Sequence, residues 1–219
     1  DNVAFLSGPN VQLFTTEHPE KGDFFTLKEI ETVISLKAET HNFPTTVEPF
    51  YGASTGTGGE IRDRMAGGTG SIPIAGTAVY CTAYPRLRNH AWQQAIHARP
   101  WLYKSPGEIL KLASDGASDF GNKFGQPLIC GSVLTFELLS EDAVIAYDKV
   151  IMLAGGVGYT LKEYTHKKAP RNGALVLHLG GENYRIGMGG GAVSSVSTGE
   201  YANAIELNAV QRANPEMQK

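Results

Sequence analysis

The stretch from Lys37 to Asp63 gathers residue types that packing alone rarely places together. Lys37 offers a point charge for phosphate, and Glu39 offers a hard oxygen ligand for Mg²⁺. His41 can take or give a proton near neutral pH. A glycine-rich run follows and ends in a second acid, Asp63. These are the parts needed to hold a magnesium nucleotide beside a polar substrate.

We predict that the glycine-rich run is a loop, because closely spaced glycines expose backbone N–H groups and let phosphate oxygens approach. It lacks the Gly-Lys-Ser/Thr of a P-loop, and it does not follow a clean βαβ strand as a dinucleotide fingerprint does. A glycine-rich turn without a ligand is the alternative. The run consists of Gly52, Ala53, Ser54, Thr55, Gly56, Thr57, Gly58, Gly59, Glu60, Ile61, Arg62 and Asp63.

The residues before the run alternate in polarity as a strand does. Even-numbered residues from 32 to 38 form one face, and odd-numbered residues from Val33 to Glu39 form the other. Extending this alternation places His41 beside Lys37 and Glu39 on the polar side. An exposed strand face with ordinary polar residues is the alternative, but the Asn42-Phe43-Pro44 turn and the glycine-rich run argue against it.

Arg62 and Asp63 are adjacent, so they point in different directions on a helix. One can clamp a phosphate while the other binds a metal, and a solvated surface pair is the alternative. On position alone, Gln211 is an ordinary helix-surface residue.

Strands alternating with helices predict a mixed α/β (α+β) architecture. We expect strands within residues 2–16, 32–39, 72–84, 127–138, 149–161 and 174–180, and helices within 58–65 and 89–98. Another helix should begin after Ser105, where Ser105-Pro106-Gly107-Glu108 has the pattern of a capping box. A polar segment at 167–173 indicates a boundary between an N-terminal domain, residues 1–165, and the beginning of a second domain, residues 166–219.

Composition bounds the function classes. The chain has 219 residues, a net charge of −3 and 42% hydrophobic residues, as expected of a soluble globular protein without affinity for nucleic acid. No apolar run reaches membrane-spanning length, and no signal peptide is visible. Cys81 and Cys130 lie far apart inside apolar runs, which indicates buried, reduced thiols of a cytoplasmic protein. The chain does not begin with methionine, and we expect a piece of a longer protein.

An ordered series of motifs resembles those of phosphoribosylformylglycinamidine synthase, in its long, single-chain bacterial form. The series covers essentially the whole chain, and it is far more specific than any one motif. The two strongest matches are Lys-Ala-Glu-Thr-His-Asn-Phe-Pro from Lys37 and the glycine-rich run up to Asp63; the others are 119–127, 151–158, 186–195 and 210–217.

The resemblance implies an ATP-dependent C–N ligase of purine biosynthesis, of the glutamine amidotransferase type. Such an enzyme converts formylglycinamide ribonucleotide, ATP and glutamine to the amidine, ADP, phosphate and glutamate. The amide oxygen is phosphorylated, and ammonia then displaces phosphate. A glutaminase domain, expected beyond Lys219, supplies the ammonia, so we expect the 219 residues alone to be inactive.

The resemblance also assigns roles by matching position. Lys37 and the run from Gly52 to Asp63 would bind ATP, and Glu39 and Asp63 would ligate Mg²⁺. Arg62 would contact the substrate phosphate, and Gln211 would reach the substrate from the second domain. His41 would be the catalytic acid or base. The substrate pocket would be lined by Thr40, His41, Asn42 and Phe43; Phe43 stands where many relatives have a second histidine.

The implied fold is that of aminoimidazole ribonucleotide synthetase, with an α+β N-terminal domain followed by an α/β domain. In that fold two N-terminal domains pair their sheets, and in the long enzymes the partner is the pseudo-symmetric second half of the chain. We therefore expect this chain alone to form homodimers or to aggregate. Two alternatives are another enzyme of the superfamily (aminoimidazole ribonucleotide synthetase, selenophosphate synthetase or thiamine-phosphate kinase) and a non-catalytic nucleotide-binding or scaffolding module.

Overall fold

The computed structural model describes residues 2–18, 21–94, 96, 103–181, 192–193, 195–197 and 199–219. The chain forms two compact units that interleave along the sequence. Unit 1 consists of Asp1–Lys37, Ile61–Ile74 and Gly156–Val176, and unit 2 consists of Ala38–Glu60, Ala75–Gly155 and Leu177–Lys219. The consecutive domains expected from the sequence, 1–165 and 166–219, stay a prediction.

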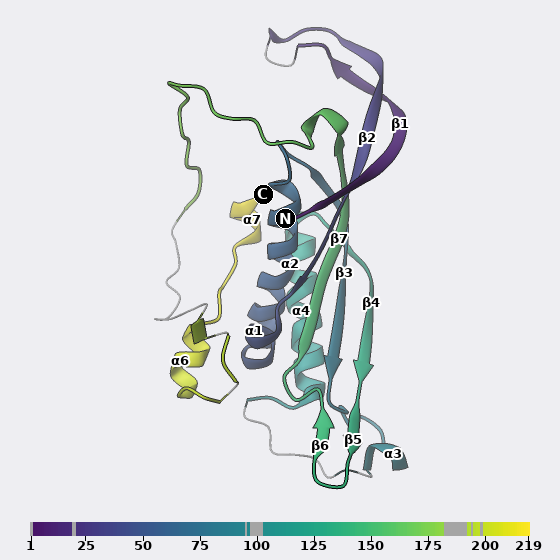
Figure 1. Ribbon diagram of the computed structural model, residues 1–219, viewed down its shortest axis with the longest axis vertical. Helices are drawn as coiled ribbons and strands as arrows, with labels where there is room; N and C mark the ends of the chain where they lie inside the picture. Colours follow the sequence, from purple (N-terminus) through teal and green to yellow (C-terminus); the bar gives the residue numbers. More distant parts are fainter. Residues whose placement is uncertain are drawn as a thin grey trace. The chain divides into compact units, whose positions relative to one another are not determined.

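The predicted mixed α/β fold is confirmed (Figure 1). The strand order in the main sheet is β1-β2-β7-β3-β4, and β5 and β6 form a separate two-stranded sheet. The strands are β1 (Ala4–Thr16), β2 (Phe25–Thr40), β3 (Ile72–Thr82), β4 (Leu128–Thr135), β5 (Glu137–Leu139), β6 (Val144–Ala146) and β7 (Ile151–Leu161). The helices are α1 (Asn42–Val47), α2 (Pro49–Met65), α3 (Ala91–Gln94), α4 (Pro106–Phe124), α6 (Asn203–Asn208) and α7 (Pro215–Gln218), with a 3₁₀ turn, η2, at Lys162–Tyr164. None of the helices in the described ranges is both long and apolar enough to cross a membrane.

Unit 1 is built on the antiparallel pair β1–β2, whose register shifts between Ser7 and Asn10. The strand expected within residues 2–16 is therefore confirmed. Hydroxyl groups fasten the adjoining segments: Ser35 Oγ lies 2.7 Å from Ser71 Oγ, and Ser71 Oγ donates to the carbonyl of Tyr159 at 3.2 Å.

The alternation predicted for β2 is confirmed, but the apolar face is the more exposed one. Val33 and Ser35, on the odd-numbered face, are buried. On the even-numbered face, Leu36 is 36% exposed, and Leu6 of β1, which pairs with Ile34 of this face, is 54% exposed. A strand whose apolar face lies toward solvent in this way has surface available for a partner.

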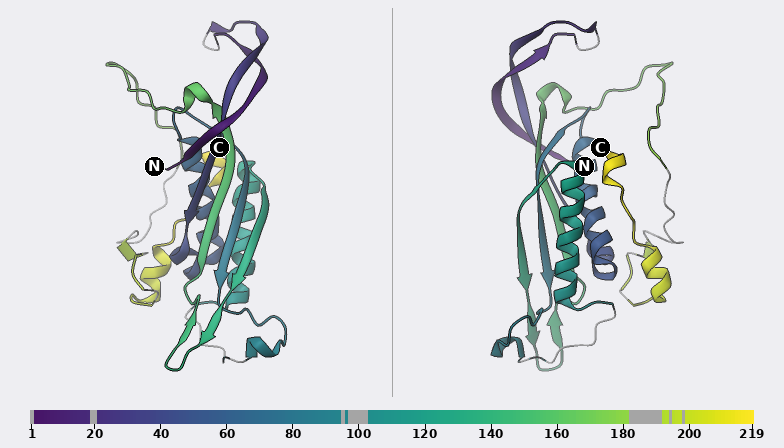
Figure 2. Two further views of the ribbon diagram at one scale, coloured as in Figure 1. Left: turned by 45° about the vertical axis from the view of Figure 1, so that its right-hand side comes forward. Right: turned by 180° about the vertical axis from the view of Figure 1, so that it is seen from behind.

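Unit 2 has a core of small side chains between helices and sheet. Ala53 of α2 and Ala113 and Ala117 of α4 pack against Ala78 and Tyr80 of β3 and against Met152 and Ala154 of β7. Figure 2 shows α4 lying along β3 and β4. Gly116 allows α4 to approach α2 closely, because a Cβ at position 116 would lie 2.0 Å from the backbone oxygen of Phe50 in α2.

The capping box predicted at Ser105 is confirmed. The Ser105 side chain accepts from the backbone N–H of Glu108, and the Glu108 carboxylate accepts from the backbone N–H of Ser105 at 2.9 Å. The Ser105 hydroxyl also donates to the Glu108 carboxylate at 2.7 Å, and this bond, followed by the one from the Ser105 backbone, lowers the pKa of the Glu108 carboxyl below its ordinary value. Gly125 ends the helix in the left-handed conformation, with φ of 99°, as glycine does at helix C-termini.

At two places the structure differs from the predicted secondary structure. The strand expected at 174–180 is wrong: this segment has no regular structure, and Leu175, Val176, Leu177 and Leu179 are largely exposed. A strand needs a neighbour for its backbone hydrogen bonds, and the described part of the chain provides none here. The helix expected within 89–98 is confirmed only for α3, and residues 95 and 97–98 lie outside the described residues.

We expect Gly116→Ala to destabilise the protein by about 1–3 kcal/mol, because the new methyl group collides with the backbone of Phe50. Gly107→Ala is the control in the same helix, since its nearest neighbour is the exposed and movable side chain of Leu87, 3.1 Å away. Its effect should stay within about 1 kcal/mol. Urea denaturation measures both, and equal midpoints would refute the role given to Gly116.

Candidate active site

The glycine-rich run predicted to be a loop is helical, so that prediction is wrong. Residues 52–63 lie inside α2, and the N–H of Gly52 donates to the carbonyl of Glu48 at 2.8 Å. The glycines serve close packing. A Cβ at Gly52 would lie 2.3 Å from the carbonyl carbon of Pro44, and one at Gly56 would lie 3.0 Å from both His41 Cβ and Met152 Sδ.

The polar side chains of the run face the interior of unit 2. Ser54, Thr55 and Thr57 are buried, and Glu60 is fully buried. Glu60 Oε1 accepts a hydrogen bond of 2.6 Å from Nε2 of Gln126, which is also fully buried. Thr55 and Glu60 therefore hold α2 in place through hydrogen bonds, whereas Thr57 Oγ1 is buried without a hydrogen-bond partner among the described residues. The contact of the run with ATP stays a prediction.

His41 is fixed at the turn between β2 and α1. The strand ends at Thr40, and His41 is the N-cap of α1. Its Nδ1 lies 2.6 Å from the carbonyl oxygen of Gly52, and its backbone N–H donates to the carbonyl of Met152 at 3.0 Å. Because a carbonyl only accepts, Nδ1 carries the hydrogen, and the lone pair of the neutral ring is on Nε2. The imidazole thus has a defined orientation and tautomer, and its catalytic role stays a prediction.

Asn42 and Phe43 anchor the turn. Asn42 Oδ1 accepts from the backbone N–H of Met152 at 3.0 Å. Phe43 is 2% exposed and packs in an apolar cluster with Val47, Val193, Ala209 and Val210. The predicted substrate contacts of Thr40, Asn42 and Phe43 stay predictions, and at Phe43 the backbone is the part left to make one.

Gln211 reaches the same part of unit 2 from the far end of the chain. Its carbonyl accepts from Thr55 Oγ1 at 3.0 Å, across 156 positions of sequence. Val210, just before it, is fully buried in the cluster around Phe43. Unit 2 therefore brings together the His41 turn, the first half of α2 and Gln211.

Lys37, Arg62 and Asp63 belong to unit 1. Lys37 Nζ and Asp63 Oδ2 form an ion pair of 2.9 Å. Arg62 is exposed; partial desolvation by the surrounding protein lowers the pKa of its guanidinium, and the neighbouring Asp63 carboxylate opposes this shift. Asp63 also lines a cavity of about 520 Å³ at the end of α2, together with Gly67, Gly68, His166 and Lys167.

Two carboxylates were predicted to ligate Mg²⁺, Glu39 and Asp63. Within the described residues no group of three or more His, Cys, Asp or Glu side chains forms a metal site. Magnesium at a nucleotide needs only one or two carboxylates, because waters and phosphate oxygens complete its shell. The chemistry of Glu39 and Asp63 fits such an ion, and their role stays a prediction.

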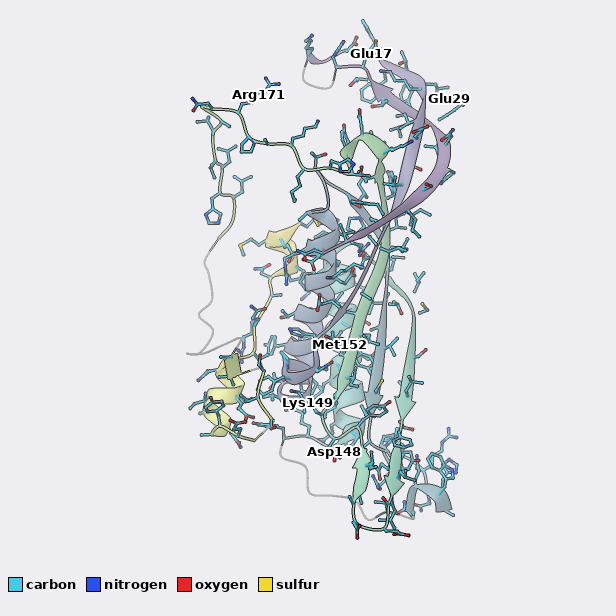
Figure 3. The ribbon with its side chains drawn as sticks, viewed as in Figure 1. Glu17, Glu29, Asp148, Lys149, Met152 and Arg171 are labelled. Atoms are coloured by element: carbon cyan, nitrogen blue, oxygen red, sulfur yellow. The ribbon has the colours of Figure 1, made fainter. Side chains whose placement is uncertain are left out.

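Sequence reasoning missed two residues that hold the turn. The backbone of Met152 bonds to both His41 and Asn42, and Thr45 Oγ1 lies 3.4 Å from its sulfur. Lys149 Nζ lies 5.5 Å from the centre of the Phe43 ring and 3.4 Å from the carbonyl of Val196. Figure 3 shows both at the end of β7 nearest to α1. No signal in the sequence pairs a strand residue with a turn that lies 110 positions away.

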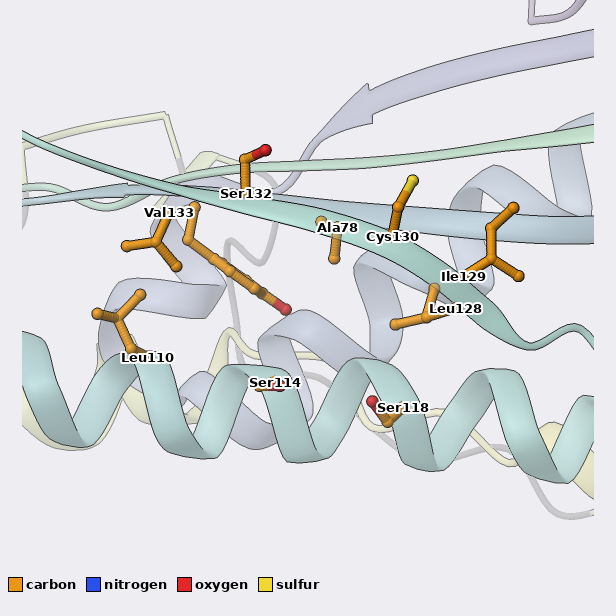
Figure 4. Close-up of a pocket in the computed structure, with 11 residues that line it drawn as sticks. Ala78, Leu110, Ser114, Ser118, Leu128, Ile129, Cys130, Ser132 and Val133 are labelled. Carbon is orange, nitrogen blue, oxygen red and sulfur yellow. The ribbon is translucent and has the colours of Figure 1, made fainter.

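A second cavity in unit 2 contains none of the predicted site residues. It has a volume of about 390 Å³ and lies between α4 and β4, lined by Tyr80, Leu110, Ser114, Cys130 and Val133 among others (Figure 4). Its lining has hydroxyl and thiol groups but no charged side chain. Cys130 is exposed, so the prediction of buried thiols is confirmed for Cys81 and wrong for Cys130.

Comparison with known proteins gives one consistent result. Human phosphoribosylformylglycinamidine synthase is 40% identical over 223 residues, which covers 100% of this chain and 17% of that protein. A probable phosphoribosylformylglycinamidine synthase of Caenorhabditis elegans is 45% identical over 184 residues, or 82% of this chain and 14% of that protein. This chain is related to one segment of phosphoribosylformylglycinamidine synthases. It spans about a sixth of the length of those relatives.

The fold supports this relation. PurL of Thermotoga maritima, solved in complex with FGAR, has a TM-score of 0.55 and 23% identity, and the match covers 85% of this chain and 25% of that chain. At this identity the likeness concerns the fold alone. No family model matches the chain. Most of the motif at 186–195, which carries part of the resemblance to the synthases, lies outside the described residues.

Gly52→Ala should displace the turn that holds His41, because the new methyl group has no room beside Pro44 and Thr45. We expect a loss of about 1–3 kcal/mol in the free energy of unfolding. We also expect a changed ¹⁵N signal of His41 Nδ1, which the carbonyl of Gly52 now orients. Gly131→Ala is the control, since its new methyl group would lie 2.4 Å from the backbone oxygen of Ala78, in the sheet and away from the turn of His41. An unchanged His41 spectrum in Gly52→Ala would contradict the packing role of this glycine.

Proposed function

We propose that this chain carries part of the synthetase site of a phosphoribosylformylglycinamidine synthase. The full enzyme would convert formylglycinamide ribonucleotide, ATP and glutamine-derived ammonia to the amidine in de novo purine biosynthesis. The observation that carries the proposal is the grouping of His41, α2 and Gln211 in unit 2, in a chain related over its whole length to these synthases. The fold neighbour PurL, solved with FGAR, supports the substrate class.

His41 would act on the proton released when ammonia attacks. ATP first phosphorylates the amide oxygen of the substrate. Ammonia then forms the new C–N bond while the C–O bond to phosphate breaks, and the nitrogen must lose a proton. Nε2 of His41 has the lone pair to accept that proton, because Nδ1 donates to Gly52. Thr40, Asn42, the backbone at Phe43 and Gln211 would bind the substrate around it.

Side chains would bind the phosphates. The backbone N–H groups of residues 52–63 in α2 already donate to carbonyls of the preceding turn, so they are not available to phosphate oxygens. Lys37 would contact ATP, and Arg62 would contact the substrate phosphate. Arg62 is exposed on the surface of α2, so its planar guanidinium is accessible to the oxygens of a phosphate. Glu39 and Asp63 would hold Mg²⁺, which when bound neutralises charge on the phosphates. Lys37 now pairs with Asp63, so the two would exchange this contact for phosphate and metal.

The remaining proposals concern the rest of the enzyme. Ammonia would come from a glutaminase domain, as in a ligase of the glutamine amidotransferase type, and the protein would be cytoplasmic. The apolar even-numbered face of β2, with Leu36, and its neighbour Leu6 on β1 would pair with the second synthetase half. A partly apolar strand face of this kind fits a partner sheet.

The decisive test uses the full-length enzyme with ammonia in place of glutamine. Phosphate release should depend on formylglycinamide ribonucleotide and should fall by about 10²-fold or more in His41→Ala, because general acid–base catalysis contributes this much. His90→Ala is the matched control, since that ring stacks on Trp92 and has no proposed role. Unchanged release in His41→Ala would remove the chemical role of His41. No substrate-dependent release at all would favour a non-catalytic module.

The 219-residue chain alone should be a dimer in light scattering, because the face with Leu6 and Leu36 lacks its natural partner. Leu6→Glu should shift the population to monomer, since it places a charge in the paired surface. Leu27→Glu, an equally exposed leucine on the odd-numbered face of β2, should leave the dimer intact. A monodisperse monomer of the unmodified chain would contradict the proposed pairing.

A further inference from the structure

A buried carboxylate lies in the C-terminal segment of unit 2, at a residue for which the sequence alone predicts no role. Glu206 of α6 is fully buried. Its Oε2 accepts from the hydroxyl of Tyr103, and its Oε1 accepts from the backbone N–H groups of Gly199 at 2.9 Å and Tyr201 at 3.3 Å. One side chain therefore ties α6 both to Tyr103, three residues before α4, and to the loop before α6.

Tyr103 is a permanent donor in this arrangement. It packs at the edge of the apolar cluster that contains Phe43 and Val210. Burial, followed by the hydrogen bond to Glu206, raises the pKa of its phenol well above the ordinary value. The hydroxyl thus keeps its hydrogen throughout the physiological pH range and points it at the carboxylate.

The position of Gln211 depends on this segment. The helix α6 has six residues, too few to be stable by itself. It is followed directly by Ala209 and Val210, which are buried against the cluster, and then by Gln211, whose carbonyl accepts from Thr55. The direction in which α6 ends therefore decides where Gln211 meets α2.

Stability alone does not explain the carboxylate. Removing a carboxylate from water is costly, and an apolar side chain of similar size often stabilises a protein as well or better. What three convergent donors on one carboxylate add is a defined orientation of the elements that carry them. A leucine at 206 would bury apolar surface but would not fix the loop at 199–201 relative to Tyr103.

We propose that Glu206 is a positioning residue: with Tyr103 and the loop at 199–201, it sets Gln211 in its place for binding the substrate. The role in substrate binding rests on the proposed function. The contacts that fix the segment are those of the described residues, and they stand independently of it.

The test measures steady-state kinetics of the full-length enzyme with ammonia. Glu206→Ala should raise the KM for formylglycinamide ribonucleotide by about tenfold or more, with the KM for ATP changed less than about twofold, since uniform binding to one substrate is lost. Glu206→Gln should recover most of this loss, because its Oε1 can still accept from Gly199 and Tyr201. Tyr103→Phe should lie between them. Equal changes in both KM values would overturn the proposal.

A double-mutant cycle separates positioning from a general loss of structure. If Glu206 acts through Gln211, then Glu206→Ala should have no further effect on the KM in a Gln211→Ala background. Independent, multiplicative effects would overturn the proposal. Hydrogen exchange of the backbone at 209–212 gives a readout without activity: exchange should accelerate in Glu206→Ala and not in Gln211→Ala. An inactive wild type would refute the proposed function, and the exchange data would still confirm or refute the positioning.

Discussion

The close approach of α2 to the turn at His41 is the constraint on which unit 2 depends. Gly52 and Gly56, one helical turn apart in α2, carry no side chain that would keep α2 away from the turn. The carbonyl of Gly52 therefore reaches the imidazole of His41. The same approach puts Ala53 into the core and Thr55 within reach of Gln211. Without this contact the ring would have no fixed tautomer, and the carbonyl of Gln211 would have no donor on α2.

Most of the polar residues near His41 have a structural role, because their side chains form hydrogen bonds within the protein. Asn42 and Thr46 accept hydrogen bonds from backbone N–H groups at or just before the start of β7. The hydroxyls of Thr45 and Thr46 also donate to backbone carbonyls of the turn itself. Glu60 and Gln126 satisfy each other in the interior. A buried polar group without a partner is costly, so these hydrogen bonds lower the cost of packing a polar motif tightly, although the hydroxyl of Thr57 is left without a hydrogen-bond partner in the described part of the chain. This internal pairing leaves His41, with an oriented ring, as the residue suited to proton transfer.

Much of the fold follows from local signals in the sequence. The capping box at Ser105 and the alternation in β2 predict their elements correctly, because the physical cause in each case lies within a few residues. The run at 52–63 was misread as a loop because glycine has the same composition signal whether it frees the backbone or lets another chain segment approach. The contacts of Met152 and Glu206 join residues about a hundred positions apart, and no periodicity in a single sequence encodes such pairs. Which face of β2 is buried could not be predicted either, because alternation distinguishes two faces without indicating which one lies inside the protein.

The glycine content of α2 has a consequence for how the protein folds. Four glycines occupy its 17 residues, and each costs a helix about 1 kcal/mol relative to alanine. A peptide with the sequence of α2 would therefore be unstructured in water, and the helix exists only when the turn at Pro44 and strand β7 are already there to receive it. We infer that α4, with its strong cap and apolar face, forms early with the strands it covers. The segment that carries the candidate chemistry would be among the last parts of unit 2 to become ordered.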